Sequence, residues 1–120
     1  MIFGLGPATK VFLAAGSTDM RKGFSGLYGL VRDRLQSDPT SGYLYLFANA
    51  RKTRLKVLFW DGSGLWVCGK QLAKGRFRWP DAGDEARIAM SHEELALLLH
   101  GIDLPPQGQR PVHHKLLTCQ

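Results

Sequence analysis

Basic side chains are concentrated in the middle of this 120-residue sequence. Residues 51–78 hold eight of them against one carboxylate, Asp61, so this segment carries +7, whereas the whole chain carries +6. The eight are Arg51, Lys52, Arg54, Lys56, Lys70, Lys74, Arg76 and Arg78. Lysine and arginine neutralise phosphates, and tryptophans among them can stack on unpaired bases. The segment therefore predicts a surface for a phosphate-rich partner, with DNA as the leading candidate.

Alternation along two expected strands, residues 54–60 and 65–72, indicates which side chains share a face. We expect Lys56, Trp60, Trp66 and Lys70 to lie together on one face of the hairpin closed by DGSG. The alternative is that the tryptophans belong to the core and the lysines form a solvated rim.

A further expected strand, residues 76–80, places Arg76 and Arg78 on one side, with Lys74 just before it. These cations are candidates for phosphate contact. The alternative is that they protect an edge strand from aggregation.

Another candidate lies in TDMRKG, residues 18–23, where Arg21 and Lys22 follow two typical helix-capping residues, Thr18 and Asp19. Cations are disfavoured at the positive end of a helix dipole, so we expect an anion such as a DNA phosphate there. The alternative is that both side chains extend into water. The candidate nucleic-acid-binding residues are thus Arg21, Lys22, Arg54, Lys56, Trp60, Lys70, Lys74, Arg76 and Arg78.

Catalytic and metal-binding patterns are weak. A polynucleotidyl transferase needs several clustered carboxylates, and only Asp19 and Asp61 flank the motifs above. Residues 64–71 match G-x-x-x-x-G-K, but Gln71 stands where a serine or threonine would hold magnesium. The histidines and cysteines do not have a usual zinc spacing. We expect no metal, no cofactor and no enzymatic activity, with an unrecognised nuclease as a remote alternative.

Length and composition favour one domain without a membrane segment, because no apolar run approaches the length that spans a bilayer. No targeting segment is recognised at the start of the chain. The two cysteines, Cys68 and Cys119, do not make a disulfide framework and favour a reducing cytoplasm. We therefore expect a cytoplasmic protein.

The expected fold class is α+β, an antiparallel β-meander of about four to six strands packed with one longer helix and a short C-terminal helix. The helices are predicted from Phe24 to Leu35 and, through a capping box at Ser91 and Glu94, up to Gly101. The strands are predicted at residues 10–16, 43–47, 54–60, 65–72, 76–80 and 87–90. Residues 1–104 would form a single domain and residues 105–120 a flexible tail.

Four blocks, TDMRKGFSGL, SGYLYLF, RLKVLFWDGSGLWVCGKQLAKGRFRWP and ELALLLHGID, resemble in order and spacing a known family. It is the TnpB accessory proteins of bacterial insertion sequences of the sixty-six family, which are unrelated to the RNA-guided nucleases of the same name. The resemblance covers about residues 9–104, and the tail PVHHKLLTCQ departs from the family pattern. The positions that carry it are Thr18, Asp19, Met20, Arg21, Lys22, Gly23, Lys56, Trp60, Asp61, Gly62, Gly75, Arg76, Phe77, Trp79 and Pro80.

The resemblance implies a helper in DNA transposition that acts beside a separate transposase and a small helix-turn-helix protein of the same element, and it does not supply a catalytic role. Our leading hypothesis is an accessory protein that contacts DNA through the basic meander and Arg21/Lys22. The alternative is an adaptor that docks the transposase through its aromatic sheet face without binding DNA. Residues 79–103, with six carboxylates against Arg87, suit a basic protein partner.

Overall fold

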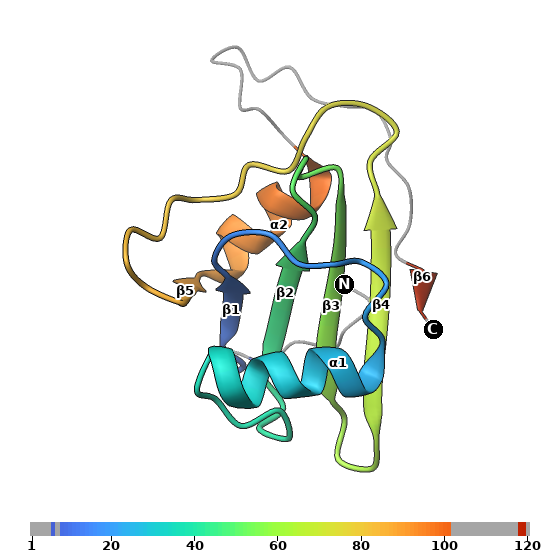
Figure 1. The fold of residues 1–120 in the computed structure, drawn as a ribbon, viewed down its shortest axis with the longest axis vertical. Helices are drawn as coiled ribbons and strands as arrows, with labels where there is room; N and C mark the ends of the chain where they lie inside the picture. Colours follow the sequence, from blue (N-terminus) through green and yellow to red (C-terminus); the bar gives the residue numbers. More distant parts are fainter. Residues whose placement is uncertain (1–5, 7, 102–117, 120) are drawn as a thin grey trace.

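The computed structural model describes residues 6, 8–101 and 118–119, and within them six strands form one sheet with a helix against each face (Figure 1). The strands are β1 (Val11–Ala14), β2 (Leu44–Ala48), β3 (Arg54–Trp60), β4 (Leu65–Gln71), β5 (Arg87–Met90) and β6 (Thr118–Cys119). The helices are α1 (Phe24–Gly29), which continues without a break into the π-helical turn η1 (Leu30–Arg34), and α2 (His92–His100). None of these helices is long and apolar enough to cross a membrane.

The strand order is β5-β1-β2-β3-β4-β6. Strands β2, β3 and β4 form the expected antiparallel meander, and the predicted α+β class is confirmed. Strand β1 is parallel to β2, since the intervening helix carries the chain back to the end where β1 began. Strand β5 returns to the far edge and pairs antiparallel with β1.

Both predicted helices are confirmed. The first extends from Phe24 to Arg34, and in its last turn the Leu35 N–H donates to the Leu30 carbonyl at 2.9 Å. The second begins at the predicted capping box, in which Ser91 and Glu94 bond each other's backbone N–H groups. It ends at Gly101, whose φ of 65° is the left-handed conformation that glycine adopts easily.

Each face of the sheet has its own hydrophobic core. On the α1 face, Leu27 and Val31 pack against side chains of β2 and β3 such as Tyr45 and Leu58. On the α2 face, Leu95, Leu98 and Leu99 pack against Leu13, Leu46, Leu55 and Val57. All five residues of β2 are buried, as expected for a strand that is covered on both sides. The surface left for polar function is therefore at the ends and edges of the sheet.

The strand predicted at residues 76–80 is wrong. The Phe77 N–H donates to the Lys52 carbonyl at 2.7 Å and the Trp79 N–H to the nearby Phe77 carbonyl, so this segment pairs with no strand. Phe77 is instead buried in the α2-face core, and Trp79 donates from Nε1 to the Ala14 carbonyl at 2.9 Å. The segment crosses the end of the sheet and is held there by its two aromatic side chains.

The expected tail, residues 105–120, lies outside the described residues except for β6, as does the predicted domain boundary at residue 104. Strand β6 pairs antiparallel with β4, where Cys119 is the register partner of Cys68. Cys68 is disulfide-bonded, which the sequence reasoning did not predict.

Candidate nucleic-acid interface

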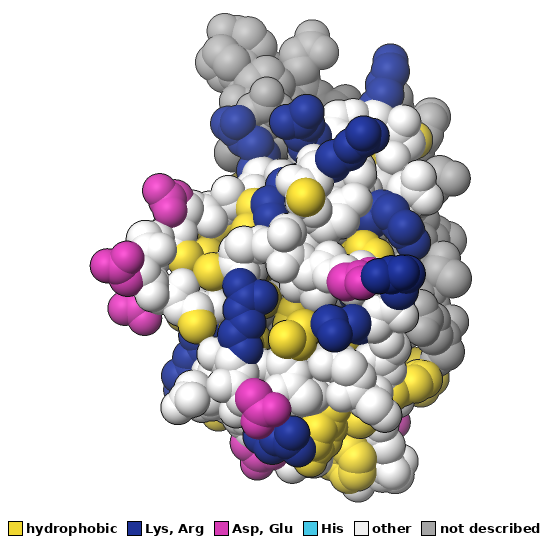
Figure 2. All heavy atoms as spheres, viewed as in Figure 1, with side chains coloured by type: hydrophobic (Ala, Val, Ile, Leu, Met, Phe, Trp, Pro, Cys, Tyr) yellow, Lys and Arg dark blue, Asp and Glu magenta, His cyan; other side chains and the backbone are white. Residues whose placement is uncertain are grey.

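The two basic segments of the sequence meet at the end of the sheet where β3 begins and β4 ends. The Leu72 N–H donates to the Thr53 carbonyl at 3.0 Å, and the contact between Phe77 and Lys52 continues this junction. Figure 2 shows Lys and Arg side chains gathered over the corresponding upper part of the α1 face. We call this cluster the basic end, and it consists of Lys52, Arg54, Lys74, Arg76 and Arg78.

Two ion pairs between carboxylates and arginines lie away from the junction of the basic segments. The ion pairs found in the described part of the chain are Arg21–Asp19 at 2.7 Å and Arg32–Asp33 at 2.8 Å. Neither involves a member of the basic end. Lys52, Arg54, Lys74 and Arg76 therefore present positive charge that no described carboxylate pairs with at short range.

Lys52 anchors the basic end to the chain that leaves β1. Its Nζ donates to the Gly16 carbonyl at 2.8 Å and lies 5.5 Å from the centre of the Trp79 ring. Burial lowers the pKa of this lysine. The candidate residues named from the sequence did not include Lys52, although its place in the basic run was a usable signal.

Segment 72–80 also borders a hollow of about 480 Å³ that is lined by Lys52, Gly75, Arg76, Phe77, Arg78, Trp79 and Gly101. Three of these residues are cationic and one is an indole. The basic end is thus concave, and a phosphate in the hollow would be approached by cations from two segments.

The expectation that Lys56 and Lys70 share a face is wrong. Trp60 is the register partner of Leu65, so Lys56 lies opposite Gly69 and Lys70 opposite Leu55. The four-residue connection DGSG produces this register, whereas a shared face requires a shift of one residue. Lys56 and Trp60 consequently face α1, and Lys70 and Trp66 face α2.

Both lysines are buried and bound to backbone carbonyls. Lys56 is 7% exposed, and its Nζ donates to the Lys22 carbonyl at 2.9 Å, which fastens the TDMRKG segment across β3. Lys70 is 5% exposed and donates to the Leu99 carbonyl in the last turn of α2, where the helix dipole favours a cation. Burial lowers the pKa of Lys70. These two contacts stabilise the fold.

The hairpin tryptophans are also separated by the register. Trp60 is half-buried, whereas Trp66 is 40% exposed and stacks on Phe59 with ring centres 6.1 Å apart. Trp66 Nε1 donates to Asp61 Oδ2 at 2.7 Å. Hydrogen bonds from the Ser63 backbone, the Trp66 indole and the Gly64 backbone lower the pKa of Asp61 to about 2. Asp61 thus closes the hairpin turn.

Arg21 and Lys22 do not lie in the first turn of a helix. The helix begins at Phe24 with Gly23 as a cap that lacks a side-chain hydrogen bond, so the prediction of a helix cap at Thr18 and Asp19 is wrong. Asp19 instead accepts hydrogen bonds from the Arg21 side chain and backbone, and these hold the pKa of its carboxyl far below the usual range. The conflict with the helix dipole therefore does not arise. Arg21, with a side chain 91% exposed, remains accessible.

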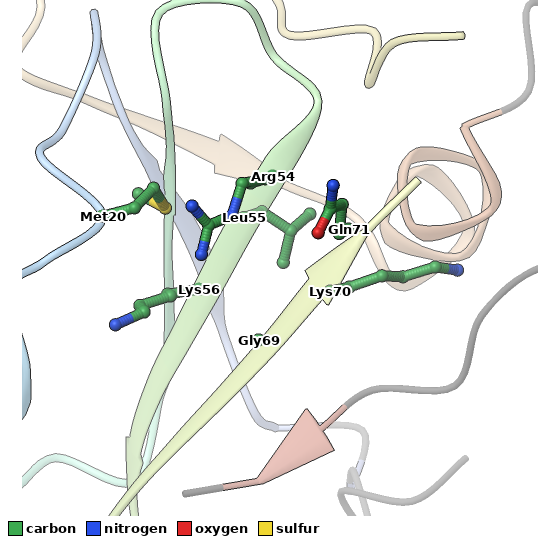
Figure 3. Close-up of a pocket in the computed structure, with 7 residues that line it drawn as sticks. All are labelled: Met20, Arg54, Leu55, Lys56, Gly69, Lys70 and Gln71. Carbon is green, nitrogen blue, oxygen red and sulfur yellow. The ribbon is translucent and has the colours of Figure 1, made fainter. Parts of the chain in front are cut away.

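A second hollow, of about 230 Å³, lies beside the basic end on the α1 face (Figure 3). Its lining includes Met20, Arg54, Lys56, Gly69 and Gln71. The sequence reasoning named Arg54 and Lys56 but missed Met20 and Gln71. Nothing in the local pattern marks these two, because the fold alone brings residue 20 next to β4.

A sequence model of the family described as "IS66 Orf2 like protein" matches residues 9–109. The chain belongs to this family. It is 36% identical over 110 residues to a protein of Sinorhizobium fredii named "Uncharacterized protein y4jC", covering 90% of this chain and 93% of the relative. It is 41% identical over 108 residues to "Uncharacterized protein y4hO" of the same organism, covering 88% and 93%. No solved structure matches.

Membership in the IS66 Orf2-like family confirms the resemblance to the accessory proteins of these elements and supports a transposition-related accessory role. The blocks that carried the resemblance come together in the structure, since Lys56 binds the TDMRKG segment and Phe77 binds the turn before β3. No group of three or more His, Cys, Asp or Glu side chains in the described residues is arranged to hold a metal ion.

Proposed function

We propose that this IS66 Orf2-like protein is a non-catalytic accessory protein of transposition that contacts DNA directly through the basic end. The observation that carries the proposal is the meeting of two basic segments, 52–54 and 74–78, at one end of the sheet, where no described carboxylate forms a salt bridge with Lys52, Arg54, Lys74 or Arg76. Such a surface attracts a polyanion and holds it by releasing counterions.

The exposed side chain of Lys22 would extend this surface on the α1 face, where Lys56 of β3 binds its carbonyl, and the neighbouring Arg21 is paired with Asp19. We propose that its partners are the transposase and the small helix-turn-helix protein of the same element. We propose that the protein acts in the cytoplasm, beside bacterial DNA.

An adaptor role is the second candidate, and a groove beside the edge strand β5 favours it. A groove of about 210 Å³ between β5 and α2 is lined by apolar side chains that include Ile88, Met90 and Leu97. Its lining holds one carboxylate, Glu94, and one cation, Arg78, and the surrounding acidic segment would attract a basic segment of the transposase.

Salt dependence separates the two roles. We expect wild-type protein to bind labelled duplex DNA with an affinity that falls steeply with salt concentration. Replacing Lys74→Gln and Arg76→Gln together should lower the slope of log affinity against log salt by about 0.9 for each phosphate that is no longer neutralised. Fluorescence anisotropy at several salt concentrations measures this slope.

A matched control removes two positive charges at the other end of the sheet, through Lys10→Gln and Arg32→Gln. Both side chains lie against tyrosine rings, away from the basic end. We expect this control to keep the wild-type slope. Equal losses of affinity in both double variants would show that only net charge matters, and the basic end would then have no special role.

A further inference from the structure

The hollow beside the basic end is lined in part by a glycine, Gly69 of β4. Gly69 shares the α1 face with its register partner Lys56, and it contributes no side chain there. Arg54 and Gln71 are register partners on the two strands, and Figure 3 shows the end group of Arg54 near Met20, with Gln71 on the other side of the hollow. Strand register and a loop contact therefore build a concave site from three separate segments.

The groups that face this hollow define what it can bind. No carboxylate is among its described lining residues. Lys56 is bound to the Lys22 carbonyl and points away from Gly69, and Lys70 extends toward α2 (Figure 3). What remains is one guanidinium, one carboxamide, one thioether, Leu55 and the half-buried backbone at Gly69.

The geometry points to a site for one unpaired nucleotide of single-stranded DNA. The flat backbone at Gly69 and the Met20 thioether offer apolar surfaces for a base. The Gln71 carboxamide both donates and accepts hydrogen bonds, as a base edge requires, and Arg54 can bind a phosphate or a guanine edge.

Size supports a single base. The hollow, at about 230 Å³, is below the range of about 300–1,000 Å³ that is typical of drug-sized ligands. A base within a duplex is stacked and paired, so it can enter only when it is unpaired. The inference rests on the proposed function, because DNA must first reach the adjoining basic end.

Filling the hollow without a change of charge tests this inference. Gly69→Val adds a side chain to the lining of the hollow, and a β-branched residue suits a strand, so we expect a folded protein. The probes are a labelled single-stranded oligonucleotide of mixed sequence and the same strand annealed to its complement. We expect Gly69→Val to bind the single strand about tenfold more weakly and the duplex within about twofold of wild type.

A second variant, Gln71→Leu, removes the base-edge group at an exposed position and guards against a folding defect at Gly69. Its single-strand affinity should also fall while its urea unfolding curve stays that of wild type. Unchanged single-strand affinity in both variants would overturn the nucleotide site and leave the basic end intact.

Two other outcomes are also decisive. Equal weakening of single-strand and duplex binding would overturn the selectivity for an unpaired base. Failure of wild-type protein to bind either probe at low salt would overturn the proposed function itself, and the nucleotide site with it. The two failures are therefore distinguishable by the behaviour of the wild-type protein.

Discussion

The lysines of the β3–β4 hairpin differ sharply from the cations of segment 72–80. Lys56 and Lys70 are buried and donate to backbone carbonyls, one on each face of the sheet. Lys74 and Arg76 are exposed and make no described ion pair. Basic residues of one sequence segment can thus have two roles, since some stabilise the fold and others stay at the surface, where they can bind a partner. Lys56 and Lys70, within the strands, enter the packed layers, whereas Arg54 at the start of β3 and the cations of the irregular segment stay at the surface.

The largest effect on stability is expected at Lys70. Replacing it, Lys70→Met, leaves the buried Leu99 carbonyl without its donor, and the free energy of unfolding should fall by roughly 1–3 kcal/mol. Urea unfolding measures the loss. Lys74→Met is the matched control, and its stability should stay within about 0.5 kcal/mol of wild type because this side chain is exposed.

Measuring the DNA affinity of the same two variants tests whether each lysine contacts DNA. Lys70→Met should retain wild-type affinity under conditions where it is folded, whereas Lys74→Met should not. Normal stability with weakened DNA binding in Lys70→Met would show that DNA reaches this lysine. That result would contradict the claim that the buried lysines stabilise the fold and only the exposed cations bind DNA.

A smaller loss of stability is expected at Lys56. Lys56→Met removes one hydrogen bond to the Lys22 carbonyl, and we expect a decrease of about 0.5–1.5 kcal/mol because water can take its place in a surface segment. The released segment should be cut more readily by trypsin after Arg21 and Lys22. Limited proteolysis with unchanged cleavage rates would show that Lys56 does not fasten this segment.

The smallest effect is a pH dependence at the hairpin turn. Hydrogen bonds from Ser63, Trp66 and Gly64 hold the folded-state pKa of Asp61 at about 2, below its ordinary value of 3.8. This carboxylate therefore contributes stability that is present above about pH 4 and is lost as the pH falls through about 2.

Asp61→Asn isolates this contribution from the other carboxylates. Its unfolding midpoint should depend less on pH than that of wild type between about pH 4 and pH 2, as thermal unfolding at several pH values would measure. Parallel pH profiles for the two proteins would mean that Asp61 does not stabilise the turn.

Local patterns predicted most of the elements. The capping box at Ser91 and Glu94 and the left-handed Gly101 act within one helix, so short sequences are enough to specify them. The prediction of a strand at residues 76–80 failed because the alternation of arginines and aromatic residues there is typical of a strand. In the structure, Phe77 and Trp79 bind distant partners, and no local pattern contains that information.

The resemblance of four sequence blocks was sufficient for the family. Composition and short-range patterns were sufficient for the α+β class, the meander and the excess of positive charge, since these depend on residues close together in the chain. Which cations lie together could be read only from the folded molecule. A register fixed by a four-residue turn sent Lys56 and Lys70 to opposite faces, and the connection from β1 to α1 brought Met20 to the same hollow as Arg54 and Gln71. Such pairings depend on closing long loops and burying two sheet faces at once, which are properties of the whole fold.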